Sequence, residues 1–449
     1  MSVDRTLARR DVLRLVSWSL LAAAPLGTAL ASPRPPRGGK VALRVPFSLR
    51  AFDPHALDDL GSMLFGGALF EGLYRLAPGL KAGDAPSLEP VLAESAPVLR
   101  DSTLTVPLRK GLVSGRGRAL QPRHFVESIE RARRGAGRFV LSGIPRPKPT
   151  ATGLEFAFKD GERLGLALAS PLLVFSGPTY SATAPDGTGP FVADGTDDAW
   201  TLRRNLRAAS GVPLLESIRI RRATSISDSL RAFEAGDDQL GFHGLGLHDP
   251  RPGARAFDAG PVGALGLAVG REAGTLDVPG VAQQLCDGLS PQRFAHLNLG
   301  PAWSPASSAG WTGAPATLLV ADDSPYLREV AETVAASLSR PGHEVTARPV
   351  AATELRERIR SRAHTLALSA YRPLWPTPLG IYGALLAASD PDHAASTLAR
   401  PPKVQNVRAL TRSLRIGLLG EIRWQGGAVG ELQVGDLSWG NMYYARKKK

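Results

Sequence analysis

The chain has 449 residues, 43 % of them hydrophobic and 21 % charged, a composition that excludes a disordered or fibrous protein. Its length predicts two or three structural units. The formal net charge is +13, but the basic residues are scattered, and zinc-finger spacing, aromatic ribonucleoprotein motifs and basic heptad regions are all missing. We therefore expect no nucleic-acid partner, and only a weak attraction of the Arg446–Lys449 tail to anionic membranes.

Cys286 is the one cysteine, so no disulfide can form within the chain. Its neighbours include the apolar Leu285 and Leu289. We expect a buried, unreactive thiol.

The N-terminus has the pattern of an export signal. Its basic residues are Arg5, Arg9, Arg10 and Arg14. An apolar run, Leu15–Leu30, follows, and Ala29–Ala31 offers small residues to a signal peptidase. We predict an export signal over 1–31, similar to twin-arginine signals, then a leader over 32–40 and a periplasmic mature protein. An uncleaved N-terminal anchor helix is the alternative.

From Val41 onward the chain alternates between strand and helix patterns. Strands are predicted near 41–47, 104–108, 218–221, 240–242, 317–320 and 345–350, and helices near 64–73, 125–132, 226–233 and 327–338. Two strand–helix–strand units, 218–242 and 316–350, predict right-handed crossovers with parallel pairing. A Pro- and Gly-rich break over 249–260 separates them, so we expect two α/β lobes.

Motifs for catalysis are missing. No glycine-rich dinucleotide fingerprint or Walker lysine follows a predicted strand, and Phe175–Pro178 lacks the first glycine of a nucleophile elbow. His243 and His248 do not have the spacing of a zinc site. We expect no cofactor, no metal and no enzymatic activity, while a hydrolase or metal enzyme with residues scattered in sequence stays an alternative.

Several segments, taken in order, resemble one known family. They are Asp53–Ala56, Leu69–Leu76, Leu88–Ser95, Leu108–Leu112, Phe125–Ala132, Gly187–Phe191 and Leu202–Asn205. Together they are similar to the extracellular solute-binding proteins of family 5, the peptide and nickel receptors of ABC importers. The resemblance implies a two-lobed periplasmic-binding-protein-like fold, type II, whose lobes close around a ligand.

The same resemblance implies a domain layout and partners. Lobe one is expected over 41–250 with an inserted subdomain near 80–165, lobe two over 260–402, and a return to lobe one over 403–449. A small-molecule ligand and an ABC-transporter permease are the implied partners, and we expect a monomer. The alternative is a degenerate member that serves as an envelope scaffold, its cleft filled by its own side chains.

Six residues on the implied cleft are candidate ligand contacts: Asp53, Thr188, Gly189, Tyr371, Arg372 and Trp375. Peptide-binding members carry an aspartate in the segment that matches Ala370–Pro378, and this chain has no acid there. A buried ammonium without a counter-charge is costly, so Arg372 favours an anionic or neutral ligand. The rings of Tyr371 and Trp375 would cover the apolar face of the ligand, or would pack the lobes.

Overall fold

The computed structural model describes residues 35–77, 87–242, 251–300, 303, 310–400, 402, 404–434 and 439–445. The predicted export signal, the leader up to residue 34, His243, His248 and the basic tail lie outside these residues. No helix among the described residues is long and apolar enough to cross a membrane.

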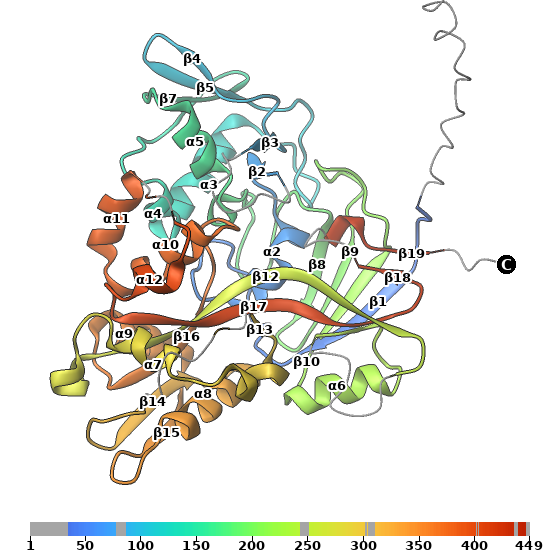
Figure 1. Ribbon diagram of the computed structural model, residues 1–449. Coiled ribbons are helices and arrows are strands. Elements are labelled where there is room, and N and C mark those ends of the chain that lie inside the picture. Colours follow the sequence, from blue (N-terminus) through green and yellow to red (C-terminus); the bar gives the residue numbers. More distant parts are fainter. Residues whose placement is uncertain are drawn as a thin grey trace, which may run out of the picture. The chain divides into compact units, whose positions relative to one another are not determined.

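One large sheet organises the described chain, and two long antiparallel strands, β12 (Ala254–Val269) and β17 (Ile416–Val429), cross its middle (Figure 1). One flank, here called lobe two, has the strands β16 (Leu366–Tyr371), β14 (Ala316–Ala321) and β15 (Val345–Val350). The other flank belongs to lobe one and has β11 (Leu240–Gly241), β1 (Lys40–Val45), β10 (Ser217–Arg222), β9 (Ala199–Arg204) and β8 (Phe191–Thr196). The short β13 (Leu299–Gly300) pairs with β17.

The parallel pairing predicted in lobe two is confirmed. Strands β14 and β15 pair in parallel, and α8 (Pro325–Leu338) joins them. Ser324 caps this helix by accepting a hydrogen bond from the Leu327 amide, and Pro325 occupies its first turn. In lobe one the pairing differs from the simplest expectation, because β10 and β11 both pair in parallel with β1, which lies between them.

A smaller sheet of four strands lies beside lobe one, in the order β4 (Val98–Arg100), β5 (Thr103–Pro107), β7 (Gly153–Phe156) and β6 (Lys148–Pro149). The helices near it are α3 (Pro122–Arg134), α4 (Gly137–Val140) and α5 (Gly161–Leu168). In Figure 1 these elements form the upper part of the view. They fall within the range 80–165, although the exact boundaries of an inserted subdomain stay a prediction.

The remaining elements have at most 12 residues each. The helices are α2 (Leu60–Leu69), α6 (Ile226–Glu234), α7 (Val281–Asp287), α9 (Ala352–Ser361), α10 (Pro378–Ser389), α11 (Pro391–Ala399) and α12 (Val407–Thr411). The 3-10 turns are η2 (Pro171–Leu173), η3 (Arg271–Leu276), η4 (Pro291–Leu297) and η5 (Trp439–Asn441), and two strand pairs are β2 (Tyr74–Leu76) with β3 (Leu88–Pro90) and β18 (Leu432–Gln433) with β19 (Tyr443–Tyr444).

The helix predicted over 64–73 ends earlier than the apolar pattern suggests. Phe70 has an extended backbone, with φ of −130° and ψ of 144°, and its amide donates to the Gly66 carbonyl. The chain after α2 is therefore extended, and the next residue, Glu71, leaves the helix. The prediction was wrong at this end because buried apolar residues continue beyond the last helical turn.

Cys286 lies in α7 and is fully buried, as predicted. Burial raises the pKa of its thiol to about 12, so the sulfur stays protonated and unreactive at neutral pH.

Candidate functional site

A cavity of about 520 Å³ opens between lobe one, the crossing strand β12 and lobe two, and this volume suits a small-molecule ligand. Its wall is built from residues of α2, the extended chain after it, and residues 91, 169–171, 174, 190, 210–212, 261–262, 372–373, 376 and 440–441. The pairing of β12 with β17 shifts register around Pro261, and Pro261 and Val262 at this irregularity line the cavity. Bulges of this kind commonly re-aim side chains beside a binding site.

Glu71 is the buried acid of this wall. Glu71 is 8 % exposed, and its Oε1 accepts a hydrogen bond of 3.1 Å from the Ser210 amide. Its Oε2 has no hydrogen-bond partner among the described residues. Burial raises the pKa of Glu71, and the hydrogen bonds from Ser210 oppose that rise.

Thr188 and Gly189 pack behind Glu71, on the side away from the cavity. The Gly189 amide donates to the Leu69 carbonyl at 3.1 Å, and the Asn205 side chain donates to the Gly189 carbonyl at 2.8 Å. Thr188 is fully buried near Glu71, but its hydroxyl has no hydrogen-bond partner in the described chain. Neither residue lines the cavity, although the next one, Pro190, does.

Gly189→Ala is expected to destabilise the fold by about 2–3 kcal/mol. A Cβ at this position would lie 2.5 Å from the Leu69 carbonyl carbon and 2.8 Å from the Ala68 oxygen, and both atoms belong to a backbone that cannot easily move. Gly67→Ala is the matched control, because its Cβ would meet nothing within 4 Å on the exposed side of the helix. This variant should raise the free energy of unfolding by up to about 1 kcal/mol. Chemical denaturation of both variants checks the contrast, which fails if they lose equal stability.

Arg372 is the one predicted contact that lines the cavity. It is 5 % exposed, and its Nη1 donates to the Pro54 carbonyl at 2.8 Å. Burial lowers its pKa to about 10, while the negative charges of Asp59 and Asp53 work in the opposite direction. The guanidinium therefore stays charged at neutral pH, and the Asp59 and Asp53 carboxylates of lobe one act on it through their charge.

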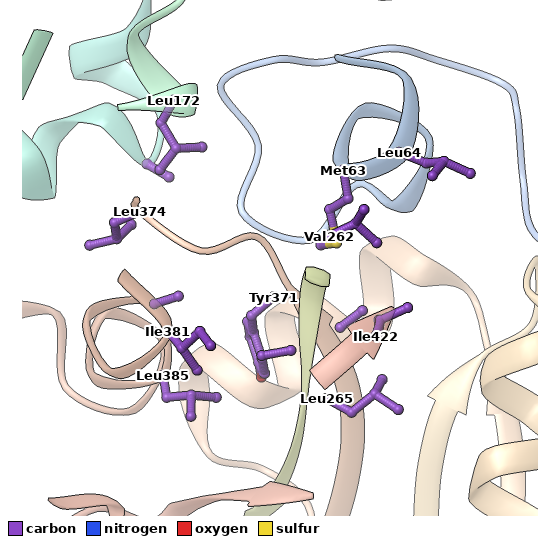
Figure 2. Close-up of a cluster of buried hydrophobic side chains, with 14 of the residues drawn as sticks. Met63, Leu64, Leu172, Val262, Leu265, Tyr371, Leu374, Ile381, Leu385 and Ile422 are labelled. Atoms are coloured by element: carbon purple, nitrogen blue, oxygen red, sulfur yellow. The ribbon is translucent and has the colours of Figure 1, made fainter. Parts of the chain in front are cut away.

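Tyr371 and Trp375 are packed in the interior rather than on the cavity wall. Each is 3 % exposed. Figure 2 shows the Tyr371 ring among apolar side chains, including Leu265 and Leu385. The Trp375 Nε1 donates to the Leu166 carbonyl in α5 at 2.8 Å.

Residues 371–376, here called the clamp segment, join lobe two to lobe one through their own hydrogen bonds. The Arg372 amide donates to the Leu57 carbonyl at 2.6 Å. The Ser170 hydroxyl donates to the Leu374 carbonyl at 2.7 Å, and this bond is buried. Together with the bonds of Arg372 to Pro54 and Trp375 to Leu166, they fix the clamp segment against three parts of lobe one.

Comparison with solved structures identifies the architecture. The peptide-binding protein DppA of Helicobacter pylori, in complex with the peptide STSA, matches with a TM-score of 0.68 and 15 % identity over 92 % of this chain and 99 % of its own. NikA of Staphylococcus aureus, in complex with Ni(L-His)2, matches with a TM-score of 0.64 and 14 % identity over 90 % and 98 %. The chain has the fold of the family 5 solute-binding proteins.

The two-lobed α/β fold predicted from the sequence is thereby confirmed. A third solved structure, the PBP AgaA from A. tumefacien R10 in complex with agropinic acid, matches with a TM-score of 0.67 and 14 % identity over 91 % of this chain and 99 % of its own. In sequence, neither a family model nor a curated protein matches the chain.

Asp53 lies apart from the cavity of this family 5 fold, in a turn where its Oδ1 accepts from the His55 amide. The nearby His55 ring is 3.0 Å from the Ser176 hydroxyl, a geometry that resembles a base and nucleophile. His55 and Ser176 are 3 % and 1 % exposed, and Arg131 also donates to Ser176, so this pair has no room for a substrate. In the described chain, no group of three acidic, histidine or cysteine residues could hold a metal.

Glu71 and Ser210 are the site residues that the sequence did not single out. Glu71 was visible only as part of the Glu-Gly-Leu turn of the family 5 resemblance. The signal that would have found it is an acid directly after a wholly apolar helix, because such an acid needs a special reason to be buried.

Proposed function

We propose that the chain is a divergent family 5 receptor that binds a small molecule in the periplasm and delivers it to the permease of an ABC importer. The observation that carries the proposal is the cavity of about 520 Å³, which both lobes line with polar and apolar groups. Solved structures with the same fold hold a peptide, a nickel complex and agropinic acid, so this architecture encloses chemically diverse ligands. Ligand binding without catalysis accounts for the missing catalytic motifs.

The domain boundaries follow from this proposal. Lobe two, over 260–402, brings the clamp segment to the cavity, and the return over 403–449 brings β17 and residues 440–441 back to lobe one. Arg372 contributes a cavity wall, whereas Thr188, Gly189, Tyr371 and Trp375 hold the wall in place. An N-terminal signal over 1–31 would export the chain.

A thermal-shift screen against short peptides, amino acids, opines, sugars and nickel complexes tests the proposal. A true ligand at 100 times its Kd adds about 2.7 kcal/mol of stability, which raises the Tm by several degrees. Gly67→Trp is the control, because Gly67 lines the cavity, its Cβ position is free of neighbours, and an indole there would occupy part of the cavity. The proposal fails if no compound shifts the parent, or if the same compounds shift this variant equally.

A scaffold role without a transport ligand is the second candidate, and the clamp segment favours it. Trp375 and Tyr371 were expected to contact a ligand, but both are buried in the interior. Trp375 also donates a hydrogen bond that joins the two lobes. Under this role the lobes would stay closed in all conditions, and no compound in the screen would shift the Tm.

A further inference from the structure

Two arginines line the cavity, and they differ in their acidic partners. Arg75 forms an ion pair of 2.7 Å with Glu89. Arg372 forms no ion pair within the described chain, although the charges of Asp59 and Asp53 act on it. An arginine stays protonated at neutral pH, so the wall keeps one positive charge that no acid of the described chain contacts directly.

The two acids near this guanidinium use their oxygens elsewhere. Asp59 accepts from the Gly61 amide with Oδ1, and from the Asp53 amide and the Ser62 hydroxyl with Oδ2, at 3.0, 2.9 and 2.6 Å. The Oδ1 of Asp53 accepts from the His55 amide at 2.9 Å. These bonds fix the turn before α2. The acids weaken the attraction of the guanidinium for an anion, but they do not occupy its donors.

One edge of the Arg372 guanidinium is free. Its Nη1 donates to the Pro54 carbonyl at 2.8 Å. Its Nε and Nη2 have no hydrogen-bond partner in the described chain, and both nitrogens stay open to solvent. These two nitrogens present parallel N–H groups along one edge of the planar group, an arrangement that matches the two oxygens of a carboxylate. Because Arg372 lines the cavity, a carboxylate that enters the cavity can reach this edge.

The rest of the wall favours an apolar body for the ligand. Its apolar side chains include Met63, Phe70, Val174 and Val262. Such a surface gains free energy by covering hydrocarbon. Glu71 offers no free oxygen to a cationic ligand, because its Oε1 accepts from the Ser210 amide and its Oε2 is closed to solvent.

We propose that the cavity takes a monocarboxylate with an apolar body, whose two carboxylate oxygens bind the free Nε–Nη2 edge of Arg372. This inference rests on the proposed receptor function and names its ligand class. The sequence left an anionic and a neutral ligand open, and the free edge favours the anion. A single negative charge matches the single cation of the wall that lacks an ion pair in the described chain.

Isothermal titration with three probes of the same hydrocarbon body tests the inference: 4-phenylbutanoate, 4-phenylbutan-1-ol and 4-phenylbutylamine. The carboxylate is expected to bind the parent at least about tenfold more tightly than the alcohol, because it adds two charge-assisted hydrogen bonds. The amine should bind more weakly than the alcohol, because it brings a second positive charge close to the guanidinium.

Two substitutions of Arg372 separate charge from geometry. Arg372→Gln removes the charge, so the carboxylate and the alcohol should bind this variant about equally tightly. Arg372→Lys keeps the charge but loses the two parallel N–H groups, so the preference for the carboxylate should fall between those of Arg372→Gln and the parent. Arg348→Gln removes an exposed arginine of β15 and is the control, which should keep the preference of the parent.

Gly67→Asp is the second test, and it decides the matter if the Arg372 variants do not fold. Gly67 lines the cavity, and a Cβ there would meet nothing within 4 Å. The new carboxylate either repels the probe or pairs with Arg372 itself, so the preference for 4-phenylbutanoate should fall at least about tenfold. Gly67→Asn has the same size without the charge, and it should change the affinities of all three probes by the same factor.

The inference is overturned if 4-phenylbutanoate binds the parent no more tightly than the alcohol. It is equally overturned if Arg372→Gln, or Gly67→Asp where the former does not fold, retains the preference of the parent. The receptor function survives these results if any compound of the thermal-shift screen stabilises the parent but not Gly67→Trp. It fails separately if no compound does so.

Discussion

Trp375→Ala is expected to lower the free energy of unfolding by about 3–5 kcal/mol. The indole is 3 % exposed, and its Nε1 supplies the bond to the Leu166 carbonyl that joins the clamp segment to α5. Removing it leaves a cavity at the junction and breaks the hydrogen bond to the Leu166 carbonyl, which then keeps only the Ala169 amide as a donor. Urea denaturation measures the loss of stability, and small-angle X-ray scattering should show a larger radius of gyration because the lobes separate more often.

Trp375→Phe separates the two contributions. Phenylalanine keeps most of the apolar packing and loses only the N–H donor, so this variant should lose about 1 kcal/mol and stay compact. If Trp375→Ala costs less than about 1 kcal/mol and leaves the scattering unchanged, the clamp segment does not hold the lobes together.

Asp59→Asn is expected to make the protein acid-sensitive. Burial lowers the pKa of His55 from 6.5 to about 4. The unfolded chain therefore binds a proton between pH 6.5 and 4 that the folded chain does not, and stability falls by about 3 kcal/mol as the pH falls through this window. The charges around His55 are Asp53, which raises its pKa, and Arg131 and Arg372, which lower it.

Asp59 opposes this effect in the parent. Burial raises its pKa from 3.8 to about 6, so the folded chain holds the extra proton and stability rises as the pH falls through the same window. Because Asp59 is only partly shielded from solvent, we expect it to add about 2 kcal/mol to the free energy of unfolding as the pH falls through this window. The two effects nearly cancel in the parent. In Asp59→Asn, only the pH dependence of stability that His55 causes should remain.

Denaturation curves at several pH values between 4 and 6.5 check this prediction. The difference between variant and parent removes the contributions of all other groups and any constant cost of losing the Asp59 cap of α2. Relative to the parent, Asp59→Asn should lose about 2 kcal/mol on acidification. A difference that does not change with pH would show that the carboxyl titrates normally.

The regular elements of lobe two could be predicted because each depends on local sequence. The strand near 317–320, the Ser324–Pro325 start and the apolar face of α8 fix one another within a short stretch of chain. The end of α2 could not be predicted in this way. Its last turn is set by Gly189, whose amide binds the Leu69 carbonyl from a distant part of the chain.

The cavity wall depends even more on distant contacts. In the sequence Arg372 has no acidic neighbour, and the charges of Asp53 and Asp59 act on it only after lobe two folds against lobe one. Trp375 reads as a candidate ligand contact, and its partner Leu166 lies in a helix far away in the sequence. Glu71 stands out only when its missing partners are counted in three dimensions.

Native mass spectrometry of the protein purified from its own envelope tests the central claim most directly. The parent should retain a stoichiometric, non-covalent small molecule, and Gly67→Trp, prepared in the same way, should lose it because the indole occupies part of the cavity. A parent that carries only the mass of its chain, or an equal adduct on Gly67→Trp, would contradict ligand binding in this cavity.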